Sequence, residues 1–174
     1  MEYNFQDKFG DNFLIRMITP ADKEYFKVGL KEMSSESIRQ RFQSAKTGFT
    51  DKELKFFTEI DQINHMAFGA SILKEGKLLP AAVIRGVRDP HRTNALEIAI
   101  TVIDHYQRRG LAMALMKIME EWAIKNNYEY FVGDMHNSND KMIKLLEKFS
   151  KERSKLVITH VGDGFLYFEV PLKK

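Results

Sequence analysis

Residues 98–113 read Ile-Ala-Ile-Thr-Val-Ile-Asp-His-Tyr-Gln-Arg-Arg-Gly-Leu-Ala-Met, and this stretch decides which fold the chain can adopt. Its first part is apolar and rich in β-branched residues, which predicts a strand over residues 96–103. Its last part begins a helix, because apolar residues recur at helical spacing from Leu111 to Trp122. A strand that enters a helix through a short loop directs free backbone N–H groups at one point, where the helix dipole favours an anion.

The loop between the two elements, residues 107–112, has the composition of an anion site. Gly110 allows the backbone to come close to a ligand, and Ala112 keeps the start of the helix free of bulk. Arg108 and Arg109 are cations at the positive end of a helix, where each costs about 0.3–1 kcal/mol unless an anion lies between them. An exposed Arg-Arg-Gly turn without a ligand would have the same sequence, so the hexapeptide alone leaves both interpretations open.

The elements on either side complete a single α+β domain over residues 1–174. Capping residues such as Thr19-Pro20 and Thr50 mark the helices, and apolar runs between turn residues mark the strands. Their order is β-α-α-α-β-β-β-α-β-α-β-β. The expected elements are a strand over 13–18, helices over 20–33, 35–42 and 51–60, strands over 65–73, 81–87 and 96–103, a helix over 111–125, a strand over 128–135, a helix capped by Ser138 and extending to Phe149, and two final strands joined by a hairpin at 162–164.

Composition excludes several classes of function. The absence of cysteine excludes a disulfide framework, a thiolate zinc site and a catalytic thiol, and the five histidines have no ligand spacing, so no metal is expected. The net charge is +3, but 24 acidic residues are interspersed among 27 basic ones, so no nucleic-acid surface is expected. No apolar run reaches the length of a membrane span, and the polar N-terminal segment is unlike a secretory signal, so the cytoplasm is the expected location.

The loop sequence resembles the Gln/Arg-x-x-Gly-x-Gly/Ala motif of the GNAT superfamily of N-acetyltransferases, and the order of elements is also that of the family. The resemblance implies the GNAT fold, a central, mostly antiparallel mixed sheet flanked by helices. It also implies that acetyl-CoA is the cofactor, with its pantetheine arm along one strand, its pyrophosphate in the loop, and an asparagine of the following helix in contact. The cofactor-binding residues would be Ile100, Thr101, Val102, Gln107, Arg108, Arg109, Gly110, Leu111, Ala112 and Asn139.

Four further segments resemble a narrower group, the GNAT domain of bacterial protein-lysine acetyltransferases, which acetylate acyl-CoA synthetases. These segments are residues 35–42, 50–54, 60–61 and 65–67. The resemblance implies a protein lysine as acceptor and an acyl-CoA synthetase as a partner. It also assigns the role of catalytic base to Glu97, which lies in a Leu-Glu-Ile-Ala sequence typical of the group.

The strand itself supports a special role for Glu97. Side chains alternate along a strand, so one face must belong to the core and the other is free for a different role. The core face is expected to hold Leu96, Ile98, Ile100 and Val102, and the other face Glu97, Ala99, Thr101 and Ile103. A carboxylate beside two small residues leaves room for a substrate. The alternative is a structural ion pair between Glu97 and a nearby arginine such as Arg85.

Two positions depart from the family pattern. Many members have a tyrosine that protonates the leaving thiolate where this chain has Leu146, and a glycine where it has Ser150. Either the thiolate leaves unaided, which a pKa of about 8.5 permits, or another group supplies the proton. Two other functions stay open: acetylation of a small-molecule amine, and an acyl-CoA-binding sensor without turnover. The sequence does not predict the physiological acceptor, the acyl-chain preference or the oligomeric state.

Overall fold

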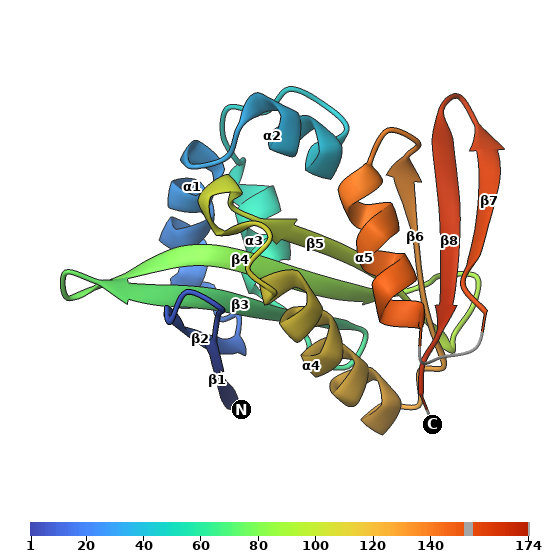
Figure 1. Ribbon diagram of the computed structural model, residues 1–174, viewed down its shortest axis with the longest axis horizontal. Helices are drawn as coiled ribbons and strands as arrows, with labels where there is room; N and C mark the ends of the chain where they lie inside the picture. Colours follow the sequence, from blue (N-terminus) through green and yellow to red (C-terminus); the bar gives the residue numbers. More distant parts are fainter. Residues whose placement is uncertain (152–154, 174) are drawn as a thin grey trace.

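One sheet of eight strands runs through the described residues, 1–151 and 155–173, of the computed structural model (Figure 1). The strands are β1 (Glu2–Gln6), β2 (Asn12–Met17), β3 (His65–Lys74), β4 (Lys77–Arg88), β5 (Ala95–Val102), β6 (Tyr130–His136), β7 (Val157–Gly162) and β8 (Phe165–Pro171). Their order across the sheet is β1-β2-β3-β4-β5-β6-β8-β7. Only β5 and β6 are parallel, and all other described neighbours are antiparallel, which confirms the predicted mixed sheet.

Helices cover both faces of this sheet. They are α1 (Lys23–Lys31), α2 (Ser35–Phe42), α3 (Asp51–Thr58), α4 (Leu111–Lys125) and α5 (Asp140–Ser150), with short 3-10 turns η1 (Pro20–Asp22) and η2 (Asp104–Tyr106). In Figure 1, α4 and α5 lie in front of the sheet and α1 and α3 lie behind it. The sheet therefore separates two layers, and β5 has one face in each.

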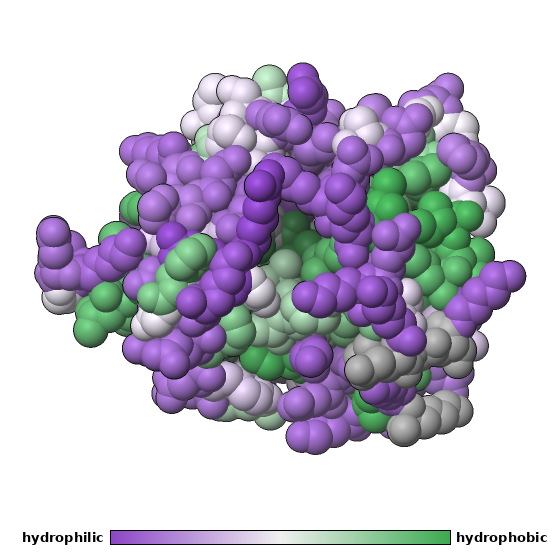
Figure 2. All heavy atoms as spheres, in the orientation of Figure 1, coloured by the Kyte–Doolittle hydropathy of each residue, from purple (hydrophilic) through white to green (hydrophobic). Residues whose placement is uncertain are grey.

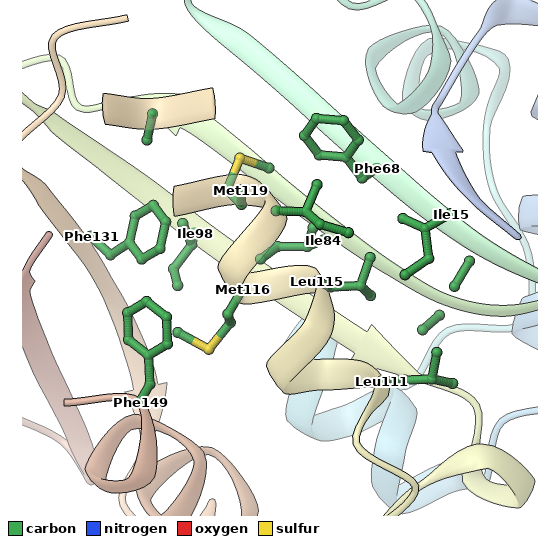
Figure 3. Packing of buried hydrophobic residues seen from close by; sticks show 14 of the residues in the cluster. Ile15, Phe68, Ile84, Ile98, Leu111, Leu115, Met116, Met119, Phe131 and Phe149 are labelled. Carbon is green, nitrogen blue, oxygen red and sulfur yellow. The ribbon is translucent and has the colours of Figure 1, made fainter. Parts of the chain in front are cut away.

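The core in front of the sheet is built on α4. Leu111, Leu115 and Met119 point from this helix to the sheet, and each is at most 1% exposed (Figure 3). They belong to one cluster with Ile84 and Ile98. Burying such a side chain contributes about 1.5–3 kcal/mol, so this face fixes α4 and the loop before it against β5.

The N-terminal strand β1 was not predicted. It pairs with β2 at the edge of the sheet, and its side chains alternate between exposed and half-buried. The turn after it is closed by Asp7, whose carboxylate accepts the backbone N–H groups of Phe9 at 2.9 Å and Asp11 at 3.0 Å. A strand with so many polar residues has a weak hydrophobic periodicity. Its position is determined by pairing with the neighbouring strand.

Helix boundaries agree with the capping residues, with two corrections. Thr50 caps α3, as predicted, and Ser34 caps α2. The first helix is interrupted at its start by η1. The last helix is capped by Asn139 and not by Ser138, because the Asn139 side chain accepts the backbone N–H of Met142.

Candidate functional site

β5 and β6 are paired at one end and separate at the other. Their register contains three residue pairs and ends at Glu97↔Val132, with no further pair in the described part of the chain. Gly133 lies where they part, and a Cβ at this position would lie 3.2 Å from the carbonyl oxygen of Ile98. The gap widens toward η2 and the first turns of α4 and α5 (Figure 1). Figure 2 shows the same place as a hollow with apolar atoms at its bottom.

The backbone of β5 presents hydrogen-bonding groups to this gap. The N–H of Ile103 donates to Ala81 on the β4 side at 2.9 Å, and in an antiparallel ladder the direction alternates from residue to residue. Ile100 and Val102 therefore face away from β4, into the gap. The carbonyl of Val102 accepts the side-chain amide of Gln107 at 3.1 Å. The groups of Ile100 and the N–H of Val102 are placed to pair with an extended ligand, as an added strand would.

The loop between β5 and α4 presents donors to the same gap. Arg108 and Gly110 have left-handed backbone conformations, with φ of 60° and 93°. α4 begins directly after Gly110, which has no side chain to cap the helix. The first N–H groups of α4 are therefore left for water or for an anion.

Polar side chains from two other helices close the mouth of the gap. Lys141 of α5 donates to the Gln107 side chain at 2.9 Å, which brings its ammonium group beside the loop. Ser37 of α2 accepts from Gln107 at 3.3 Å. Asn139 lies at the same end of α5, where its oxygen accepts the backbone N–H of Met142 and its amide N–H groups are left for a ligand. Sequence reasoning missed Lys141, because no pattern in the chain indicates that this lysine turns toward the loop.

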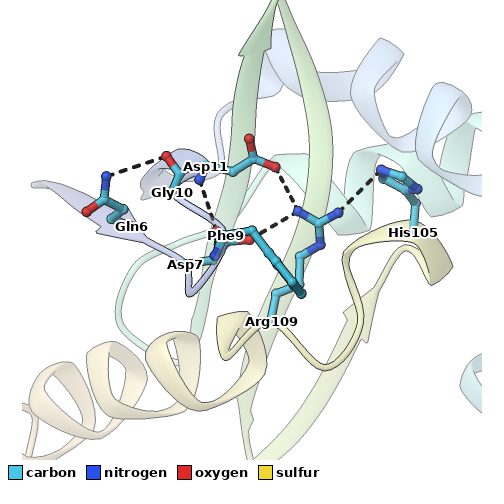
Figure 4. Close-up of polar contacts among 7 residues, drawn as sticks. All are labelled: Gln6, Asp7, Phe9, Gly10, Asp11, His105 and Arg109. Atoms are coloured by element: carbon cyan, nitrogen blue, oxygen red, sulfur yellow. Dashed lines mark hydrogen bonds and ion pairs between the residues drawn. The ribbon is translucent and has the colours of Figure 1, made fainter.

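Arg109 does not point into the gap. Its guanidinium donates to Asp7 at 3.1 Å and to Asp11 at 2.7 Å, and lies 3.5 Å from the ring nitrogen of His105 (Figure 4). The expectation that both arginines lack a partner without an anion is wrong for Arg109. The side chain of Arg108 is exposed, so it is the cation of the pair that can meet a ligand.

The ion pair of Arg109 joins the β1–β2 turn to the loop. Replacing Asp7 by asparagine should lower the melting temperature, because the asparagine side chain can keep the turn's hydrogen bonds but removes the charge facing Arg109. Burial raises the pKa of Asp7, but the N–H groups of Phe9 and Asp11 and the guanidinium of Arg109 outweigh it, so the pKa is lowered. The stabilisation should be complete above the unfolded pKa of about 3.9 and disappear as the pH falls through the lowered pKa.

Thermal unfolding of both proteins between pH 3 and pH 7 would measure this difference. Asp163→Asn is a matched control, because Asp163 is an exposed residue in the turn of another hairpin. Equal melting temperatures for Asp7→Asn and the unchanged protein at neutral pH would show that the ion pair does not hold the turn to the loop.

A cavity of about 260 Å³ lies on the face of β5 that points away from α4, and Glu97 lines it. This volume is slightly below the range of pockets for drug-sized ligands, so it suits a side chain or a small molecule. Ala99 follows on the same face, as the alternation predicted. The cavity is lined by Arg41, Phe56, Phe57, Arg85, Val87, Glu97 and Ala99.

Glu97 is exposed in this cavity and is not part of the core. Partial burial raises the pKa of its carboxyl, the negative charges of Asp134 and Asp89 raise it further, and the positive charge of Arg41 opposes them. A carboxylate with a raised pKa is a stronger base than an ordinary glutamate. Such a group can accept a proton from a substrate held in the cavity.

The alternative of a structural ion pair between Glu97 and Arg85 does not occur in the described residues. Arg85 instead donates to the carbonyls of Phe57 at 2.7 Å and Phe56 at 3.4 Å, and contacts the ring of His65. These carbonyls are at the C-terminal end of α3, where a cation is favourable. Arg85 therefore caps α3 and leaves Glu97 free.

Leu146 is one of the two positions that depart from the family pattern. Leu146 is fully buried in the core, so it leaves no room there for a proton donor.

Among residues 1–151 and 155–173, no three histidine or carboxylate side chains gather in a way that could hold a metal ion. No helix in that part of the chain is both long and apolar enough to cross a membrane.

Comparison with known proteins identifies relatives of this arrangement. The model of the acetyltransferase (GNAT) family matches residues 32–150. The chain is 32% identical over 144 residues to Acetyltransferase Pat of Mycolicibacterium smegmatis, an alignment that covers 82% of this chain but only 42% of that protein. The GNAT domain of S. lividans PAT superposes with a TM-score of 0.85 at 23% identity, covering 98% of this chain and 97% of the other. A putative acetyltransferase from Salmonella typhimurium, solved with its cofactor acetyl-CoA, superposes with a TM-score of 0.68 at 14% identity, covering 93% and 95%.

Proposed function

Since the chain belongs to the acetyltransferase (GNAT) family, we propose that it transfers the acetyl group of acetyl-CoA to a primary amine, most specifically to a lysine side chain of a protein. One observation carries this proposal. Glu97 lies in a cavity on one face of β5, and three residues further along the same strand Ile100 faces the β5–β6 gap. A base and a site for an extended cofactor thus meet on a single strand.

In this proposal the cofactor lies in the β5–β6 gap. The pantetheine arm pairs with Ile100 and Val102, next to Thr101, and the pyrophosphate lies at the first turn of α4. The loop would bind it through backbone N–H groups, with Arg108 adding its charge and Arg109 holding the loop in place. Asn139 and Lys141 would contact the cofactor from α5. The residues of the pyrophosphate site would be Gln107, Arg108, Arg109, Gly110, Leu111 and Ala112.

Glu97 would act as the general base. A lysine ammonium has a pKa of about 10.4, so it must lose a proton before its nitrogen can attack. Glu97 takes this proton, directly or through water, and the amine attacks the thioester carbonyl. A backbone N–H of the 100–102 segment stabilises the negative oxygen. This attack forms the C–N bond and a tetrahedral intermediate. When the intermediate collapses, the carbonyl re-forms, the C–S bond breaks and CoA leaves as the thiolate, without an acid at position 146. The second proton of the amine passes to water or to the departing thiolate.

The cavity beside Glu97 favours a protein lysine over a polyamine. Two guanidinium groups, Arg41 and Arg85, face this cavity with a single carboxylate. A polyamine carries several positive charges, and like charges in a confined site repel one another. The similarity to Acetyltransferase Pat and to the PAT domain also supports a protein acceptor, although the chain spans less than half the length of the first. Because the donor is acetyl-CoA, we assign the reaction to the cytoplasm.

The acceptor is tested by following CoA release with no acceptor, with polyamines and with an acyl-CoA synthetase. Release should be fast only with the synthetase, and mass spectrometry should find acetyl groups on one or a few of its lysines. Rapid acetylation of polyamines alone would favour a small-molecule enzyme. Tight binding of acetyl-CoA without turnover on any amine would favour a sensor, an alternative that the accessible Glu97 argues against.

A further inference from the structure

We propose that Arg41 forms an anion subsite inside the acceptor cavity, so that the enzyme prefers an amine with a carboxylate close to it. The inference rests on the proposed function and specifies its substrate class. For a protein acceptor, the carboxylate would belong to an aspartate or glutamate beside the target lysine.

The side chain of Arg41 has no anionic partner in the described residues. It lies in the last turn of α2 and lines both the Glu97 cavity and the neighbouring space under α1 and α3. Its guanidinium forms neither a hydrogen bond nor an ion pair with any described residue. Its nearest ring contact is with Phe42, at 5.0 Å. Burial lowers the pKa of Arg41, and the charge of Glu97 only partly offsets this. The guanidinium is half-buried, and its hydrogen-bonding groups have no partner among the described residues, so they are available to a ligand that enters the cavity.

The other buried or half-buried arginines among the described residues have hydrogen-bond acceptors or anionic partners. Arg16 forms an ion pair with Asp22 at 2.6 Å, and Arg109 is held between two aspartates. Arg85, in the same cavity as Arg41, has the carbonyl groups of α3 as acceptors. Arg41 differs from all three because it lines the cavity and forms no hydrogen bond or ion pair with a described residue.

The charge balance during the reaction also requires an anion. Before binding, Glu97 partly balances the charges of Arg41 and Arg85. His65 adds no charge near neutral pH. Burial lowers its pKa to about 4, and the positive charge of Arg85 contributes to this shift. Once Glu97 accepts the proton of the amine, the cavity contains two guanidinium groups and no carboxylate. A carboxylate on the acceptor would balance Arg41 throughout the reaction, and it would offset the repulsion between Arg41 and the incoming ammonium group.

The test compares two peptides of the same sequence that carry the target lysine next to glutamate or next to glutamine. We expect the unchanged enzyme to have a kcat/KM about 10-fold higher for the glutamate peptide, a typical value for a charge-assisted hydrogen bond. Arg41→Gln should abolish this preference by lowering the rate with the glutamate peptide. Arg39→Gln is the matched control, because Arg39 is an exposed arginine of the same helix. A third arm with free glutamate as the amine shows whether a free amino acid also meets the requirement.

Two outcomes would overturn the subsite. One is equal kcat/KM for the two peptides with the unchanged enzyme. The other is a preference that survives in Arg41→Gln while the pH profile shifts equally for both peptides, because Arg41 would then act only on Glu97. Binding of the same peptides with acetyl-lysine, measured by fluorescence anisotropy, separates this result from failure of the proposed function. Discrimination in binding without any acetyl transfer would leave the subsite in place and refute the reaction.

Discussion

Replacing Glu97 by glutamine should lower turnover by a factor of about 10²–10⁴, the usual contribution of a positioned general base, while the Kd for acetyl-CoA stays the same. Glutamine keeps the size of the side chain and cannot take the proton of the amine. The cofactor would lie in the β5–β6 gap at the edge of β5, whereas the Glu97 side chain is in the cavity on the face of β5 that points away from α4. Steady-state kinetics with acetyl-CoA and a lysine substrate, together with calorimetric titration of acetyl-CoA, would measure both quantities.

The pH profile distinguishes loss of a base from loss of structure. Because the pKa of Glu97 is raised, kcat/KM of the unchanged enzyme should fall on the acid side at a higher pH than an ordinary glutamate would give. This acid limb should be absent in Glu97→Gln, and part of the activity should return at high pH, where solvent deprotonates the amine. Asp134→Asn is a control that keeps the base, and it should move the acid limb to lower pH because Asp134 contributes to the raised pKa. Full activity of Glu97→Gln near neutral pH would leave another carboxylate, acting through water, as the base.

Most of the fold could be predicted because its elements carry local signals. Alternation along residues 96–103 predicted which side chains face the core, and the structure buries Leu96 and Ile98. Ile100 and Val102, predicted for the same face, are only half-buried, because they lie beyond the last pair of β5 with β6. Ile103, predicted for the other face, is buried. Capping residues predicted where α2 and α3 begin. The polar strand β1 carries no such signal, since its position depends on pairing with β2.

The candidate site could be predicted only where it depends on local sequence. The face that Glu97 occupies follows from alternation along the strand, whereas the assignment of the loop to the cofactor comes from its resemblance to the family motif. The partners of Arg109 lie about a hundred residues away, at Asp7 and Asp11, and nothing near the loop indicates them. The same is true of Arg41, which comes from another helix to the cavity of Glu97. Charge pairs between distant elements are tertiary contacts, and the sequence pattern of either element does not predict them.

Replacing Gly110 by valine should weaken acetyl-CoA binding by at least about 100-fold. Gly110 has a φ of 93°, which a β-branched residue adopts only with strain of about 1–2 kcal/mol. Any Cβ at this position would lie 3.2 Å from the ring of Phe5, so the ring would have to shift slightly. The larger part of the effect would come from the side chain occupying the place where the backbone must approach the pyrophosphate. Calorimetric titration of acetyl-CoA into folded variant, checked by circular dichroism, would measure it.

Gly76→Val is the control for the effect of backbone strain alone. Gly76 has a φ of 74° in the β3–β4 turn and no atom within 4 Å of an added Cβ, so this variant has a similar strain without touching the loop. It should lose stability and keep its affinity for acetyl-CoA. Arg108→Ala should lower the affinity less than Gly110→Val and make it less dependent on salt, because Arg108 is exposed while Arg109 is held by Asp7 and Asp11. Unchanged affinity in folded Gly110→Val protein would mean that the Arg-Arg-Gly segment is an exposed turn and that the pyrophosphate binds elsewhere.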